Sequence, residues 1–267
     1  KVEADKLAGL DELFKWTLHA AKQALDDAGQ CDEIKRRCGV VLGNIGMPNH
    51  TGKRMLNGFY SDILEPYVRK LLGTDTFTFH REGDVSSGDK DNLSVASLNA
   101  IIASDSLGLQ GPSYTLDAAC ASALYSIKVA SDYLNTGKVD MMLAGAVCHA
   151  DRIYIAHGFN ILQAFPDVHE QSIPFDSNSQ GLKAGEGAGV VALKRLSDAQ
   201  ANGDRIYGVI ESIGLSNDGG AKHILVPDSG GQLKALQRAY DNVEEQTEYL
   251  ECHATGTPVG DQVELNT

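Results

Sequence analysis

The sequence predicts an α/β protein whose helices lie on both faces of largely buried sheets. Two patterns support this prediction: amphipathic helical segments alternate with short apolar runs, and these runs contain too few polar residues for a sheet that faces water. The chain has 267 residues, of which 42% are hydrophobic and 22% charged, and this is enough to bury a sizeable core. We therefore expect a folded globular protein of the α/β class.

The first predicted elements are two helices and a strand. Apolar residues at helical spacing predict an amphipathic helix over residues 10–29 that ends at Gly29. The run C-G-V-V-L-G-N at 38–44 predicts a short buried strand, and the apolar residues over 95–102 mark a second helix. This alternation is typical of α/β proteins.

The alternation continues through the rest of the chain. Residues 121–134 are predicted to be helical, and the apolar run at 139–147 is predicted to be a buried strand. The later elements are strands at 187–195, 205–214 and 247–252 and a helix near 230–244. Because the segment 196–205 is polar, we expect it to join two structural halves, with a boundary near residue 200.

The charge balance argues against polyanionic partners. The chain has 23 Lys and Arg against 36 Asp and Glu, which gives a net charge of -13 at pH 7. Such a chain repels nucleic acid and anionic lipid, so neither is an expected partner. No apolar run reaches the roughly 20 residues of a membrane span, and the N-terminus lacks the layout of a signal peptide. We therefore expect a cytoplasmic protein with no membrane span.

The number and spacing of the cysteines argue against two common roles. Their number is odd and no C-x-x-C pair occurs, which argues against a disulfide framework and against a zinc site. The histidines also lack the spacing of metal ligands, so no metal is expected. We expect chemistry at one or two cysteines at most, from the set Cys31, Cys38, Cys120, Cys148 and Cys252.

Cys120 lies where a strand gives way to a helix, in the stretch Y-T-L-D-A-A-C-A-S-A-L-Y-S at 114–126. If the helix begins at or just after this cysteine, its unpaired N–H groups and positive dipole end lower the pKa of the thiol. The next three residues are small and leave room above the sulfur. The alternative from this stretch alone is a small structural core residue.

His253 follows the predicted strand at 247–252 directly, in E-C-H-A-T-G-T-P-V-G-D-Q-V-E at 251–264. The carboxyl ends of strands are where α/β sheets carry their chemistry, although a histidine there can also be structural. Neighbouring residues on a strand point to opposite faces, so Cys252 should face away from the partner of His253. A catalytic cysteine and histidine pair would therefore be Cys120 with His253.

Two motifs in this order identify a family. D-A-A-C-A-S-A-L at 117–124 resembles the D-x-A-C-S-S-x-L nucleophile motif of β-ketoacyl synthases, and H-A-T-G-T-P-V-G-D-Q-V-E at 253–264 resembles their H-G-T-G-T-x-x-G-D-x-x-E motif. F-D-S-N-S-Q-G-L-K-A-G-E-G-A-G at 175–189 lies between them. The resemblance covers nearly the whole chain and is nearest to the ketosynthase domain of multidomain polyunsaturated fatty acid synthases, which are similar to type I polyketide synthases. Ala254, where most ketosynthases have Gly, fits that group.

The resemblance implies a thiolase-like layered αβαβα fold of two related halves, working as a homodimer beside other domains of a multidomain synthase. Residues 1–200 would form the N-terminal half, without its first strand, and 201–267 the incomplete start of the C-terminal half. Cys120 would accept an acyl chain from the phosphopantetheine arm of an acyl carrier protein. His253 would help to decarboxylate malonyl-carrier and stabilise the enolate. No cofactor would be bound by the domain itself.

The resemblance also implies roles for neighbouring residues of the two motifs. Thr255 and Thr257 match hydroxyls that contact the pantetheine arm in the family, although turn residues after a strand would look the same. Glu264 matches an acid that supports the site through a lysine further along the chain. Asp261 would stabilise the turn, and Glu186, in G-E-G-A-G near the cavity, would be structural.

The family pattern further implies that the chain is a fragment cut inside its second half. The lysine that pairs with Glu264, a second catalytic histidine and a glycine-rich oxyanion loop would lie beyond Thr267. We therefore expect this chain to be acylated at Cys120 and not to condense. The alternative is a catalytically silent thiolase-fold module that serves in dimerisation or carrier docking, and the retention of Cys120 argues against it.

Overall fold

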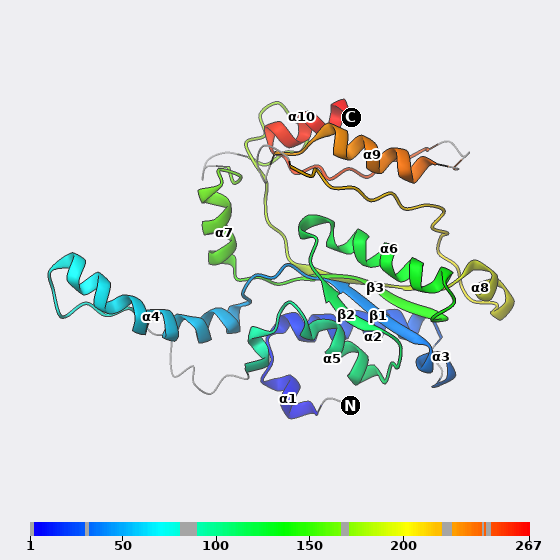
Figure 1. Cartoon of the computed structure of the whole chain (residues 1–267), viewed down its shortest axis with the longest axis horizontal. Helices are drawn as coiled ribbons and strands as arrows, with labels where there is room; N and C mark the ends of the chain where they lie inside the picture. The colour runs from blue at the N-terminus through cyan, green and yellow to red at the C-terminus, as the bar shows by residue number, and fades with distance from the viewer. Residues whose placement is uncertain are drawn as a thin grey trace. The chain divides into compact units, whose positions relative to one another are not determined.

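The computed structural model describes residues 3–29, 32–80, 90–166, 171–220, 226–241, 243 and 247–267 (Figure 1). The chain divides into two compact units. The first comprises Lys1–Arg152 and Glu186–Arg205, and the second comprises Ile153–Gly185 and Ile206–Thr267. Each unit is therefore built from two separate stretches of the chain. This division does not test the predicted boundary near residue 200, which concerns the two halves of the family fold and stays a prediction.

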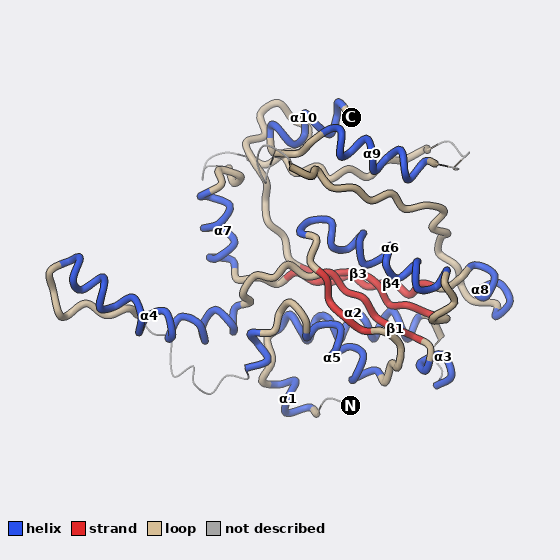
Figure 2. Tube along the Cα trace, in the orientation of Figure 1, coloured by secondary structure: helices blue, strands red, loops and turns tan. Residues whose placement is uncertain are grey.

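A mixed sheet of four strands forms the centre of the first unit. The strands are β1 (Cys38–Gly43), β2 (Ser113–Leu116), β3 (Met141–Cys148) and β4 (Gly187–Leu193). Their order across the sheet is β2-β1-β3-β4, with β1 parallel to both β2 and β3 and β4 antiparallel to β3. Figure 2 shows the strands of this sheet in red. The strands predicted at 38–44, 139–147 and 187–195 are thus confirmed.

Helices cover both faces of this sheet, as the apolar strands predict. On one face, α2 (Glu12–Asp27) and α5 (Leu98–Leu107) pack against Val40 and Leu42 of β1. On the other face, α6 (Ser122–Asn135) packs against Val41, which points the opposite way along the same strand. The first unit therefore forms a helix, sheet, helix sandwich, and the helices predicted at 10–29, 95–102 and 121–134 are confirmed.

Shorter helices and one long helix complete the first unit. The long helix is α4 (His50–Leu72), capped at its start by the Asn49 side chain and ended by Gly73 in the left-handed conformation. It was not predicted, because its apolar residues form no continuous stripe and it contains Pro66. The other elements are α1 (Ala4–Ala8), α3 (Asp32–Arg36), α8 (Leu196–Asn202) and the 3-10 turns η2 (Lys90–Leu93) and η3 (Ala119–Ala121).

The second unit contains α7 (Arg152–Ile161, whose first residue belongs to the first unit), α9 (Ser229–Tyr240) and α10 (Pro258–Asn266). The helix predicted near 230–244 is confirmed as α9. The strands predicted at 205–214 and 247–252 are wrong, because neither segment is a strand in the structure. An apolar run becomes a strand only when a neighbour pairs with its backbone, and no described residue of this unit forms a ladder with either segment.

Within the described ranges, none of the helices combines the length and the apolar character needed to cross a bilayer.

Candidate active site

The segment that carries Cys120 is a sharp change from strand to helix. β2 ends at Leu116, η3 follows, and α6 begins at Ser122. Ala119, directly before the cysteine, has a left-handed backbone with a φ of 50°. Cys120 itself is exposed. The predicted position of the thiol, between a strand and the start of a helix, is therefore what the structure shows.

Two side chains hold this turn in place. The Asp117 carboxylate accepts hydrogen bonds from the backbone N–H of Ala119 at 2.9 Å and of Gly46 at 2.8 Å. The Ser122 hydroxyl accepts from the N–H of Ala118 at 2.9 Å and donates to the carbonyl of Ala119 at 2.6 Å. The residue before Cys120 is thus fixed through both its N–H and its carbonyl group.

Close backbone contacts fix the start of α6 against the sheet. A Cβ atom added at Gly43 would lie only 2.6 Å from the Cβ of Ser122, so β1 approaches the helix here more closely than a side chain allows. One turn later, the Ser126 hydroxyl donates to the carbonyl of Gly145 at 2.8 Å and accepts from its N–H at 3.0 Å. The sheet therefore determines where Cys120 lies.

The other thiols differ from Cys120 in exposure. Cys38 is buried, and removal of water raises the pKa of its thiol to about 12. Cys148 and Cys252 are partly exposed, and the pKa of Cys252 is raised by desolvation first and then by neighbouring carboxylates. Cys31 lies outside the described residues. Among the described cysteines, Cys120 is the most accessible to solvent and is the best placed for chemistry.

In the second unit, Glu264 of α10 fixes the backbone at His253. Its two carboxylate oxygens accept hydrogen bonds from the N–H of His253 at 2.7 Å and of Ala254 at 2.9 Å. Ala254 has a φ of 49°, which is again a left-handed conformation, and His253 is exposed. Glu264 therefore supports the histidine through direct contacts with its backbone.

Asp261 ties the same loop to a distant segment of the second unit. It is buried, and its carboxylate accepts from the N–H of Gly256 at 3.0 Å and of Phe175 at 2.6 Å. The Ser179 hydroxyl donates to the carbonyl of Gly256 at 2.6 Å. The loop after His253 is thus joined to Phe175 and Ser179, which belong to the motif at 175–189.

The hydroxyls of Thr255 and Thr257 form a pair within this loop. Their oxygens lie 2.8 Å apart, and the pair is partly buried. In such a pair one hydroxyl donates to the other, so one donor hydrogen remains for a further acceptor. This arrangement suits a contact with a polar ligand group and also suits a turn before a helix.

Glu186 lies in the first unit, at the residue before β4 begins. It forms an ion pair with Arg152, and the hydrogen bond from this arginine lowers the pKa of the carboxyl group. The imidazole Nε2 of His149 lies 3.7 Å from the same carboxylate. These contacts join the two stretches of the first unit and involve none of the residues that hold the Cys120 turn.

The structure places the candidate residues in two groups, one in each unit. The first unit contains Cys120 and Glu186, and the second contains His253, Thr255, Thr257, Asp261 and Glu264. Sequence reasoning missed the residues that hold the Cys120 turn, although an aspartate two positions before a strained residue is a known turn signal. Within the described part of the chain, no group of three potential ligands lies close enough to hold a metal ion. The residues missed are Gly43, Gly46, Asp117, Ser122 and Ser126.

Comparison with family models gives matches over both halves of the chain. The model for the N-terminal domain of beta-ketoacyl synthases matches residues 1–199, and the model for their C-terminal domain matches residues 207–267. Together they cover both motifs.

The relatives that match in sequence include synthases much longer than this chain. The chain is 34% identical over 265 residues to a polyunsaturated fatty acid synthase protein of Thraustochytrium sp., and the match covers 96% of this chain and 13% of the relative. It is 37% identical over 227 residues to a phenolphthiocerol/phthiocerol polyketide synthase protein of Mycobacterium tuberculosis, and this match covers 84% of the chain and 12% of the relative. The chain therefore spans a small part of the proteins it matches.

Solved structures agree with this result. A PfaC keto synthase-chain length factor superposes with a TM-score of 0.87 at 46% identity, covering 98% of this chain and 28% of that one. The ketosynthase from module 6 of the bacillaene synthase of Bacillus subtilis 168 superposes with a TM-score of 0.74 at 27% identity, covering 96% and 40%. The predicted α/β class and thiolase-like fold are thereby confirmed. With family models matching along nearly its whole length, the chain belongs to the β-ketoacyl synthase family.

Proposed function

We propose that the chain provides the condensing site of a β-ketoacyl synthase that works in polyunsaturated fatty acid or polyketide biosynthesis. The observation that carries this proposal is the exposed Cys120 on a turn whose backbone is held by Asp117 and Ser122. A catalytic nucleophile needs access for its substrate and a fixed position, and this thiol has both. The names of the relatives support the substrate class.

The first proposed step is acyl transfer to Cys120. The sulfur attacks the carbonyl carbon of an acyl thioester on the phosphopantetheine arm of a carrier protein. The bond from carbonyl carbon to carrier sulfur then breaks, and the carrier thiol leaves with the proton that Cys120 loses. A covalent thioester on Cys120 splits one difficult condensation into two easier steps. The backbone N–H of Cys120 supplies one donor for the developing oxyanion.

The second proposed step is decarboxylative condensation. Malonyl-carrier loses carbon dioxide, and the electron pair of the broken bond forms an enolate on the remaining two-carbon unit. The His253 imidazole stabilises this enolate, and the enolate carbon attacks the carbonyl carbon of acyl-Cys120. The carbon–sulfur bond breaks and returns its electron pair to Cys120, which leaves a β-ketoacyl chain on the carrier. Thr255 and Thr257 bind the pantetheine arm, Asp261 and Glu264 position the loop, and Glu186 is structural.

The proposed partners follow from this chemistry and from the relatives. Both steps use substrates that arrive on an acyl carrier protein, so the domain needs no bound cofactor of its own. The relatives are large synthases, which supports other domains of such a synthase as neighbours. We further place the protein in the cytoplasm as a homodimer.

The proposal is tested by following acylation and condensation separately. The purified chain is mixed with an acyl-pantetheine thioester, and the peptides are analysed by mass spectrometry. Acyl-Cys120 is expected, Cys120→Ser is expected to remove it, and Cys148→Ser serves as the matched thiol control. With malonyl-carrier added, no β-ketoacyl product is expected from this chain, whereas in a complete synthase that contains it His253→Ala is expected to lower release of carbon dioxide by about 10² to 10³ while acylation persists, as for loss of one preorganised donor.

Two outcomes would contradict the proposal. Acylation of another cysteine in the folded chain would refute Cys120 as the nucleophile. A folded chain that binds the carrier and is never acylated would instead support the catalytically silent module.

A further inference from the structure

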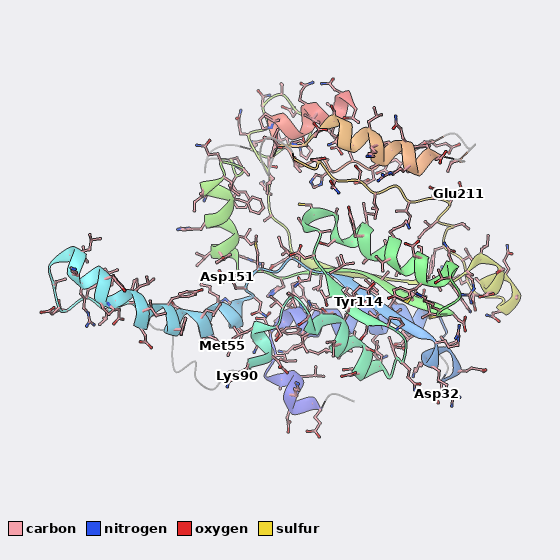
Figure 3. All side chains as sticks on the ribbon, in the orientation of Figure 1. Asp32, Met55, Lys90, Tyr114, Asp151 and Glu211 are labelled. Atoms are coloured by element: carbon pink, nitrogen blue, oxygen red, sulfur yellow. The ribbon has the colours of Figure 1, made fainter. Side chains whose placement is uncertain are left out.

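A polar cavity lies in the first unit, away from the Cys120 turn. It has a volume of about 570 Å³, and its polar lining comes from Lys22, Asp32, Lys35, Arg36, Ser106 and Gln110. These residues belong to α2, to α3 and to α5 with the connection from it to β2. α3 precedes β1 and Gln110 precedes β2, so the cavity lies at the amino ends of these two parallel strands (Figure 3, Asp32). Cys120 follows the carboxyl end of β2, at the other edge of the sheet.

The cavity carries an excess of positive charge in an acidic chain. Lys22, Lys35 and Arg36 line it against the single carboxylate of Asp32, whereas the chain as a whole has a net charge of -13 at pH 7. Lys35 lies 3.8 Å from Asp32, which is too long for a hydrogen bond, and Lys22 pairs with Asp26 on its own helix. Lys22 is therefore neutralised by its own partner, whereas Lys35 and Arg36 on α3 present positive charge to an anion that enters the cavity.

A buried hydroxyl is the second observation that points to a ligand. The Ser106 oxygen is buried and has no hydrogen-bond partner among the described residues. Buried polar groups are normally paired, and a group without a partner calls for a bound water, ion or ligand. Ser106 also lines the cavity, so a ligand bound there is a candidate partner for this hydroxyl.

The walls of the cavity are held together by the backbone. The N–H of Gln110 donates to the carbonyl of Lys35 at 3.0 Å, which joins α3 to the connection that leads into β2. The N–H of Gly111 then donates to the carbonyl of Cys38 at 2.9 Å. The cations on α3 and the hydroxyl on α5 are thus parts of one assembly.

We propose that this cavity binds a small phosphorylated molecule. Lys35 and Arg36 offer several N–H donors to the oxygens of a phosphate group, and Arg36 can do so through two parallel bonds. The volume lies within the usual range of small-molecule sites, about 300 to 1,000 Å³. The site is separate from the proposed acyl-transfer chemistry, so its occupation is compatible with acylation of Cys120.

The test is a titration of the full chain with pyrophosphate at about 0.15 M salt, followed by calorimetry. Saturable binding at one site is expected. The double variant Lys35→Ala, Arg36→Ala is expected to raise the Kd by about ten- to a hundredfold for each charge-assisted bond that is lost. The matched control is Lys128→Ala, Lys138→Ala, which removes the same charge from the same unit at another place and should leave the Kd unchanged.

Unfolding midpoints of the two double variants establish that each is folded. Ser106→Ala is a further variant that changes no charge, and it is expected to weaken binding. Equal loss of binding in the test and control variants would show general attraction to positive charge and overturn the site. Binding that no variant changes would also overturn it. Succinate bound as tightly as pyrophosphate would refute the preference for a phosphate group.

Discussion

Replacement of Gly43 by alanine tests whether the sheet positions the nucleophile. Gly43 is the last residue of β1, and a Cβ atom there would lie 2.6 Å from the Cβ, 2.7 Å from the carbonyl carbon and 2.8 Å from the carbonyl oxygen of Ser122. Such atoms normally stay about 3.5 Å or more apart. Two of the three contacts are with backbone atoms, so no side chain can rotate away, and α6 must move by about 1 Å to restore ordinary contact distances.

The movement should reach Cys120 through hydrogen bonds that the structure shows. The Ser122 hydroxyl holds the N–H of Ala118 and the carbonyl of Ala119, so a shift of Ser122 pulls on the turn that carries the thiol. Overpacking of this kind costs about 1 to 3 kcal/mol of stability. A displacement of about 1 Å at a reacting group lowers its rate by about 10².

The assay combines urea unfolding with the rate of acylation of Cys120 by an acyl-pantetheine thioester. Gly43→Ala is expected to lower both the free energy of unfolding and the acylation rate. The matched control is Gly46→Ala, where the added Cβ would lie 3.4 Å from the Asp117 carboxylate. It should change little. If Gly43→Ala acylates at the rate of the unmodified chain, the close contact does not position the thiol and the reasoning is wrong.

Three further predictions follow from the contacts. Limiting iodoacetamide at neutral pH should label Cys120 first, because it is exposed, and Cys38 last, because burial raises its pKa to about 12. Early modification of Cys38, measured by peptide mass spectrometry, would contradict this. Glu264→Gln should leave the backbone N–H of His253 or of Ala254 unpaired, which costs about 1 to 3 kcal/mol of stability. Hydrogen exchange in the loop before α10 should then be faster, and unchanged exchange would contradict this prediction. The hydrogen bond from Arg37 lowers the pKa of Asp140, so the folded pKa lies below the unfolded value of about 3.9. The stability that this pair contributes is fully present above the unfolded pKa and is lost as pH falls through the folded pKa. Urea unfolding midpoints, measured from neutral pH down to about pH 3, should therefore fall less for Asp140→Asn than for the unmodified chain. Midpoints that fall equally in both proteins would contradict this.

The sheet of the first unit and its covering helices were predictable because their patterns are strong. Every residue of β1 is buried, and its alternate side chains meet helices on opposite faces, which the continuous apolar run at 38–44 already indicates. The helix α4 was not predictable in the same way. Its buried positions are Gly52, Ser61 and Glu65, so the residues that face the protein are not the apolar ones on which a periodicity argument depends.

The second unit shows where local sequence stops determining structure. Residues 205–214 and 247–252 contain the β-branched and aromatic residues that are typical of strands, yet the structure shows no strand at either segment. A helix satisfies its backbone within one segment, so α9 forms from a local pattern. A strand depends on hydrogen bonds with another segment, and a sequence pattern contains no information about whether that segment is in place.

Both candidate functional side chains lie next to an alanine in the left-handed conformation. Ala119 precedes Cys120 with a φ of 50°, and Ala254 follows His253 with a φ of 49°. This conformation costs an alanine roughly 1 to 2 kcal/mol, so the surroundings must impose it. In each case the alanine N–H donates to a carboxylate, that of Asp117 or that of Glu264. A hydrogen bond to a charged group is worth about 1.5 to 3 kcal/mol, which is enough to offset the strain. The two acids therefore act on the backbone beside the reactive groups.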